Sequence, residues 1–111
     1  MIATVPREVK KSTFFAVAIY VTCLQDVHRF INFIDLQFPD AAHNMAAWRL
    51  TDKNGIIEEG ADEDGEAGAG SFMLFVLQQR KVQNVVVVCT RFFGGVLLGP
   101  LRFRLISEHT A

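Results

Sequence analysis

Four consecutive valines, Val85–Val88, constrain the fold of this chain more than any other feature. β-branched side chains favour extended backbone, and a strand that is apolar at every position has no face suited to water. We therefore predict a strand over residues 84–90 in an interior position of a sheet. The rest of the chain must supply its neighbours.

Three further strands are indicated by the patterns upstream. Residues 14–21 are rich in aromatic and β-branched side chains and predict a second buried strand. Residues 43–51 alternate, with Ala46, Trp48 and Leu50 on one side and Met45, Ala47 and Arg49 on the other. Asn54-Gly55 then predicts a hairpin leading to a returning strand at residues 56–60. An extra strand around residues 2–5 would bring the total to five.

Helical periodicity occurs in the intervening segments. Leu24, Val27 and Ile31 belong to an apolar stripe that predicts a helix over residues 23–38, with Thr22 and Gln25 as a capping box. Ser71 is the expected N-cap of a second helix ending near residue 80, and Gly99-Pro100 would open a third. The order β-α-β-β-α-β-α predicts one domain, residues 1–111. The expected fold class is α/β (α+β): a two-layer sandwich whose mixed sheet of four to five strands carries its helices on one face.

Composition limits the class of protein. Half of the residues are hydrophobic and ten are phenylalanine, so the core needs no disulfides. Cys23 and Cys89 are expected to be buried free thiols of a reducing compartment. No apolar run approaches the roughly 20 residues of a membrane span, and we expect a cytoplasmic protein without membrane contact. Six acids lie between Glu58 and Glu66, while the net charge is −1.

The glycine-bearing loops do not match known catalytic or cofactor motifs. Gly94 and Gly99 have the spacing of a phosphate-binding loop, but Pro100 stands where that loop needs lysine. An EF-hand counted from Asp62 places Met73 at the position of the bidentate glutamate. No spacing pairs a nucleophile with a base. We therefore predict no catalytic residues, no cofactor and no dedicated metal site.

A binding surface is the remaining interpretation of these loops. Arg91-Phe92-Phe93-Gly94-Gly95 leaves the end of a strand, where ligands and partners of α/β sheets are often bound. We expect this segment to meet the acidic turn Asp64-Gly65-Glu66 at one edge of the sheet. His43 opens the alternating strand, as either a structural or a functional histidine.

Four short motifs, most of them glycine-bearing or charged, occur in order along the chain. They are Lys10-Lys11-Ser12-Thr13-Phe14, Ala42-His43-Asn44, Glu63-Asp64-Gly65-Glu66 and Arg91-Phe92-Phe93-Gly94-Gly95-x-x-Leu98-Gly99. Together they resemble the IMPACT family of uncharacterised and regulatory proteins. The resemblance covers roughly residues 9–111, and the ending from Leu97 to Phe103 is similar to that of the eukaryotic branch. It implies a fold like domain 2 of ribosomal protein S5.

The resemblance also implies a role in translational control. Eukaryotic members carry an RWD domain ahead of this one and compete for the ribosome-associated activator of the general-control kinase. We therefore expect a non-enzymatic regulatory module whose partner is this activator or the ribosome. An RNA-binding module and a small-molecule enzyme are the alternatives, and the oligomeric state is open. The candidate contact residues are Lys10, Lys11, His43, Asp64, Gly65, Glu66, Arg91, Phe92, Phe93, Gly94, Gly95 and Arg102.

Overall fold

The structure is a computed structural model that describes residues 2–4, 7–9 and 12–92. The third predicted helix lies outside these residues, as do Lys10, Lys11, Phe93, Gly94, Gly95 and Arg102. In the described part the elements are β1 (Ile2–Ala3), β2 (Arg7–Val9), β3 (Ser12–Tyr20), α1 (Leu24–Gln37), β4 (His43–Thr51), β5 (Ile57–Asp62), α2 (Ala69–Arg80) and β6 (Val85–Phe92).

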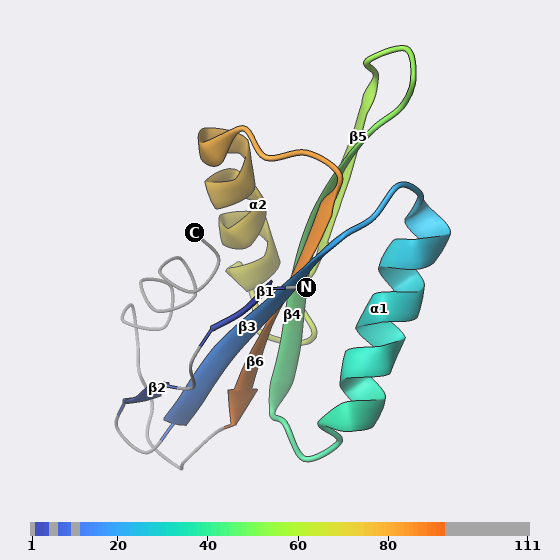
Figure 1. Cartoon of the computed structure of the whole chain (residues 1–111). Coiled ribbons are helices and arrows are strands. Elements are labelled where there is room, and N and C mark those ends of the chain that lie inside the picture. Colours follow the sequence, from blue (N-terminus) through green and yellow to red (C-terminus); the bar gives the residue numbers. More distant parts are fainter. Residues whose placement is uncertain (1, 5–6, 10–11, 93–111) are drawn as a thin grey trace.

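The valine run occupies the centre of the sheet, as predicted. The strand order is β1-β3-β6-β4-β5, and β2 also pairs with β3 (Figure 1). Val88 of β6 is paired with Val17 of β3 on one side and with Ala46 of β4 on the other. The α+β class and the four long strands are therefore confirmed, and β1 supplies the extra strand near the start of the chain. The short strand β2 was not predicted and brings the described sheet to six strands instead of four to five.

The sheet is antiparallel in every described pairing, and the prediction of a mixed sheet is wrong in this respect. Helix α1 connects β3 to β4, and these two strands run in the same direction. They do not pair with each other, because β6 lies between them and runs the opposite way. Insertion of the last described strand thus separates the two strands that would have formed a parallel pair.

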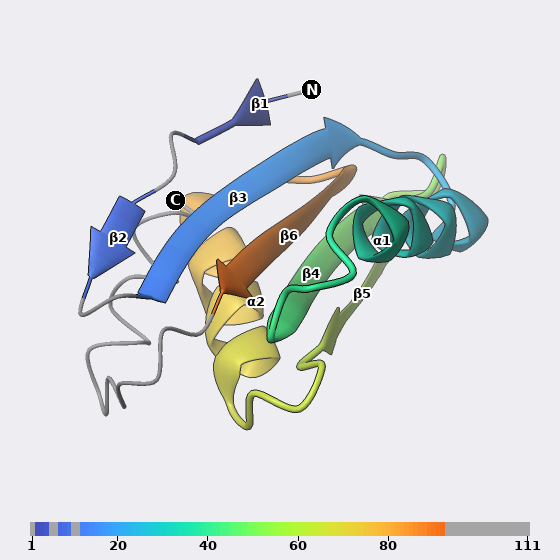
Figure 2. The ribbon, with the colours of Figure 1, turned by 90° about the horizontal axis from the view of Figure 1, so that it is seen from below.

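The helices lie on opposite faces of the sheet, whereas the prediction placed them on one face (Figure 2). Met45 of β4 belongs to a cluster with Met73 of α2, while its neighbour Ala46 belongs to a cluster with Val27 and Phe30 of α1. Neighbouring residues of a strand point to opposite faces, so α1 and α2 each cover one. The predicted alternation of β4 is confirmed, and its side chains pack alternately into the cluster under α2 and the cluster under α1.

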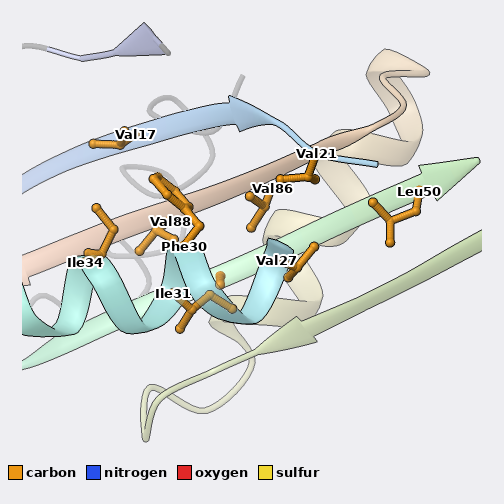
Figure 3. Packing of buried hydrophobic residues seen from close by; sticks show 10 residues of the cluster. Val17, Val21, Val27, Phe30, Ile31, Ile34, Leu50, Val86 and Val88 are labelled. Carbon is orange, nitrogen blue, oxygen red and sulfur yellow. The ribbon is translucent and has the colours of Figure 1, made fainter. Parts of the chain in front are cut away.

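The cluster beneath α1 shows why the valine run has no polar position. Ile31 and Ile34 of α1 project toward the sheet, where Val86 and Val88 of β6 meet them (Figure 3). The alternate residue Val87 lies in the other cluster, with α2. Burial on both faces therefore requires an apolar side chain at each of these positions.

Both helices begin without the caps that the sequence predicts. Helix α1 has Cys23 as N-cap and no side-chain capping bond, so the box of Thr22 and Gln25 is not formed. Helix α2 begins two residues before Ser71, after Gly68 in left-handed conformation with φ 83°. Cys23 is exposed, in contrast to the prediction, and Cys89 is buried; both are free thiols. No helix in the described ranges is long and apolar enough to span a membrane.

Candidate functional site

The acidic turn between β5 and α2 lies against the end of β6. Arg91 is paired in register with His43 of β4 and Phe14 of β3. Its guanidinium donates a hydrogen bond of 2.6 Å from Nη1 to Oε2 of Glu66. The two side chains are only 6% and 9% exposed, so this is a buried ion pair. The structure therefore brings Arg91 and the turn together, as the sequence motifs led us to expect.

The surroundings of Arg91 fix it in place. The guanidinium carbon lies 5.6 Å from the centroid of the Phe14 ring, within the range of a cation–π contact. The backbone oxygen of Arg91 accepts a hydrogen bond of 2.8 Å from the amide of Ala42. Charges removed from water are tolerated only with close partners of this kind. Arg91 therefore anchors the turn and leaves little surface for direct contact with a partner.

His43 joins the start of β4 to the turn through both ring nitrogens. Nδ1 lies 2.7 Å from the backbone oxygen of Asp64, and because a carbonyl can only accept, Nδ1 carries the hydrogen. Nε2 lies 3.4 Å from Oε2 of Glu66, the same oxygen that Arg91 contacts. The side chain is 27% exposed, so one edge of the ring remains at the surface.

The backbone of the turn adopts one specific shape. Asp64 and Gly65 have φ values of 47° and 82°, the left-handed region that glycine adopts without strain. Oδ2 of Asp64 accepts a hydrogen bond of 2.7 Å from the amide of Asn44 on β4. Oδ1 of Asp62 accepts one of 3.0 Å from the amide of Asp64. One of these bonds lies within the turn and the other joins the turn to β4, so together they hold the exposed carboxylate of Asp64 in a defined position.

Three residues of this network were not among the predicted site residues. The hydroxyl of Thr90 donates to Oδ1 of Asn44 at 2.8 Å, and Nδ2 of Asn44 donates to Oδ1 of Asp35 at 3.0 Å. Thr90 and Asn44 are buried. Their sequence signal is a polar residue inside an apolar strand, since buried polar groups need partners.

Phe92 is described by the structure but does not join the site. Its ring lies 6.2 Å from that of Phe15 and 6.1 Å from that of Phe38, and it is partly buried in this aromatic group. Phe15 and Phe38 pack against the cluster under α1, whereas Phe14 beneath Arg91 belongs to the cluster under α2. Phe92 therefore covers the core on the face opposite to the acidic turn.

The thiol nearest to Arg91 along the chain and the acidic side chains around the turn are the candidates for nucleophilic and metal-binding chemistry. Burial raises the pKa of the Cys89 thiol to about 12, so the thiol stays protonated at neutral pH and is a poor nucleophile. Within the described ranges, no group of three or more histidine, cysteine or acidic side chains could hold a metal ion. What the site presents to solvent is the Asp64 carboxylate, beside the exposed edge of His43.

Sequence comparison identifies the family. Residues 10–111 match the Impact N-terminal domain. The Protein IMPACT homologue of Schizosaccharomyces pombe is 39% identical over 101 residues, covering 89% of this chain and 36% of the relative. That of Dictyostelium discoideum is 42% identical over 104 residues, covering 91% and 30%. That of Saccharomyces cerevisiae is 37% identical over 109 residues, covering 96% and 42%. The chain thus spans about a third of the length of these relatives.

Solved structures agree with this result. The crystal structure of a hypothetical protein superposes with a TM-score of 0.87 at 28% identity, covering 97% of this chain and 54% of the other. The two-domain translational regulator Yih1 superposes with a TM-score of 0.70 at 35% identity, covering 97% and 43%. By sequence and by fold, the chain belongs to the Impact N-terminal domain family.

Proposed function

We propose that this chain is a non-enzymatic regulatory module of translational control that binds a protein partner through the turn Asp64-Gly65-Glu66. The similarity to the translational regulator Yih1 supports the regulatory role. The observation that carries the proposal is the buried Arg91–Glu66 ion pair, which holds an exposed acidic turn in one shape. The partner we propose is the ribosome-associated kinase activator or the ribosome, in the cytoplasm.

A turn that is already ordered is well suited to recognition. Binding costs conformational entropy whenever a loop must be ordered, and a preorganised loop avoids most of this cost. Here the hydrogen bonds of Asp64 to Asn44 and of His43 to Asp64 are made before any partner arrives. The accessible Asp64 carboxylate can then meet a basic group of the partner directly.

The charge of this region favours protein over RNA as the partner. Six acids lie between Glu58 and Glu66, and phosphate contacts require basic groups instead. Arg91, the cation nearest to the turn in the described structure, is buried and paired with Glu66. A basic protein surface is the complementary partner.

The test removes the charge of Asp64 and keeps its hydrogen bond. In Asp64→Asn the amide oxygen can still accept from the amide of Asn44, so the shape of the turn is retained. The full chain is immobilised and incubated with the purified kinase activator and, separately, with purified ribosomes. We expect the retained amount of one of them to fall about threefold or more, since one charge-assisted contact is lost.

Asp26→Asn is the matched control, because it removes one aspartate charge on α1, away from the turn. It should retain the wild-type amount. Equal retention by wild type and Asp64→Asn would contradict the proposal. Binding that disappears after ribonuclease treatment would favour the RNA alternative.

A further inference from the structure

We propose that the outer edge of β5 binds an extended, basic segment of a protein partner by strand addition. Among the residues that the structure describes, β5 is the last strand of the sheet and pairs only with β4, and the hairpin that carries it projects beyond both helices (Figure 1). On the other side of the sheet, β1 and β2 pair with β3. An edge strand without a neighbour presents backbone donors and acceptors to which another chain can pair.

The hairpin register identifies the backbone groups that face outward. The amide of Asp52 donates to the oxygen of Ile56 at 3.0 Å, so this residue pair is hydrogen-bonded. Antiparallel pairs alternate between bonded and non-bonded, and β5 continues from this point. The amides and carbonyls of Ile57, Glu59 and Ala61 therefore point away from β4. Three residues at alternate positions are the pattern that an added strand would use.

An aromatic surface lies beside this edge on the α1 face. Gly60 is paired with Trp48 of β4, and a Cβ placed on Gly60 would lie 2.5 Å from Cζ2 of Trp48. The indole ring therefore extends across Gly60 toward the edge, and glycine is required because a side chain would displace the ring. A residue of an added strand opposite Gly60 would lie next to this indole.

Two carboxylates flank the same position. Glu58 and Asp62 share the α1 face with Gly60, since they pair with Leu50 and Ala46 of the cluster under α1. Both are exposed, and neither has an ion-pair partner among the described residues. A lysine or arginine opposite Gly60 would meet an indole ring and two acids, a combination that stabilises a cation.

On the other face of β5, Ile57 and Ala61 lie on either side of Glu59, whose carboxylate is already paired with Arg49, so this face favours an apolar residue at the alternate position. Ile57 is 44% exposed and Ala61 is partly buried against the cluster under α2. An occupant that alternates basic and apolar side chains therefore matches both faces. A second copy of this chain does not, because antiparallel pairing of two β5 edges would bring the Glu58 and Asp62 carboxylates of both copies together.

The probe is a dye-labelled ten-residue peptide of alternating lysine and valine, titrated against the full chain by fluorescence anisotropy. Its valines face α2 and exchange hydrogen bonds with Ile57, Glu59 and Ala61. The same peptide N-methylated at each valine keeps its charge and loses these donors, so it should bind at least about tenfold more weakly. Amide hydrogen exchange at the three residues should slow when the unmodified peptide binds.

The matched variants test the charge. Glu58→Gln with Asp62→Asn should weaken binding by about five- to tenfold, because two flanking carboxylates are lost. Asp26→Asn with Asp40→Asn removes two charges elsewhere and should change the dissociation constant less than about twofold. Asp64→Asn should also leave peptide binding unchanged, which separates this inference from the proposed function of the turn.

Three outcomes would overturn the proposal. The first is an N-methylated peptide that binds as well as the unmodified one, since only non-specific charge attraction would then remain. The second is no binding, or unchanged exchange at Ile57, Glu59 and Ala61. The third is slow exchange at these amides in the absence of peptide that speeds up on dilution, which would show that a second copy occupies the edge.

Discussion

Two arginine–glutamate pairs of similar geometry have different roles in this domain. In the first pair, Nη1 of Arg91 lies 2.6 Å from Oε2 of Glu66, and the two side chains are 6% and 9% exposed. In the second pair, Nε of Arg49 lies 3.0 Å from Oε2 of Glu59, and the side chains are 11% and 32% exposed. Arg49 and Glu59 are direct neighbours on β4 and β5, which the backbone ladder already holds together. Glu66 lies in a loop outside the sheet. The buried pair therefore fixes a conformation, whereas the other pair adds to one that exists without it.

The largest effect is expected when the buried pair loses one charge. Glu66→Gln should lower the free energy of unfolding by about 3 kcal/mol, because Arg91 would remain buried with less compensation. The measurement is urea denaturation followed by far-UV circular dichroism. A loss below about 1 kcal/mol would mean that the pair behaves like a surface pair, and the contrast with Arg49 would fail.

The second prediction tests whether water is excluded from the end of β6. Burial raises the pKa of Cys89, two residues before Arg91, to about 12 from an ordinary value of 9.0. Above pH 9 the unfolded chain releases this proton while the folded chain retains it, so stability falls as the pH rises toward 12. Between pH 8 and 10, wild type should lose about 1.4 kcal/mol more than Cys89→Ala does.

Cys23→Ala is the control for this experiment, since Cys23 is exposed in the folded chain. It removes a thiol at the surface and so controls for the loss of a thiol in itself. If Cys89→Ala shows the same pH dependence as wild type, water reaches the end of β6 and the buried pair is better solvated than its exposure indicates.

A smaller effect is expected at the second pair. Glu59→Gln should lower the free energy of unfolding by less than about 1 kcal/mol, because Glu59 is about a third exposed and remains hydrated. The amide oxygen of the glutamine can still accept the hydrogen bond from Nε of Arg49, and the bond that is lost, from Gln78 to the other carboxylate oxygen, lies at the surface. The same urea titration gives the value, and a loss equal to that of Glu66→Gln would remove the distinction between the pairs.

The smallest effect is the response of each pair to salt. Double-mutant cycles give the coupling energy of Arg49 with Glu59 and of Arg91 with Glu66. Raising the salt from about 0.1 M to about 1 M should reduce the first coupling by a few tenths of a kcal/mol and leave the second nearly constant, because salt screens exposed charges far more than buried ones. Equal screening of both would contradict the assigned burial.

The positions of the strands and helices could be predicted because their signals are local. The valine run, the alternation of β4 and the spacing of Val27, Phe30 and Ile31 each follow from the period of one element. The face of the sheet that each helix covers does not follow from the period of a single element. The apolar stripes of α1 and α2 can be buried equally well if both helices pack on the same face of the sheet or if each packs on its own face. Only the packed structure shows that the domain has three layers.

The candidate site was predictable in part for the same reason. Two motifs with charge and glycine indicated that Arg91 and the Asp64 turn belong together, and they do. The burial of Arg91 was not predictable, since it depends on Glu66 and the Phe14 ring approaching from other elements. Asn44 and Thr90 form a hydrogen bond with each other between β4 and β6, and the sequence alone does not show that these two strands are neighbours.

The central place of β6 has a consequence for synthesis on the ribosome. β3 and β4 share a sheet only through β6, which is the last strand of the described chain. During synthesis, the edges of β3 and β4 that pair with β6 stay unpaired until residue 92 has left the exit tunnel. The sheet of this domain can therefore close only after β6 has been synthesised, and a nascent chain truncated before β6 should be a substrate for chaperones.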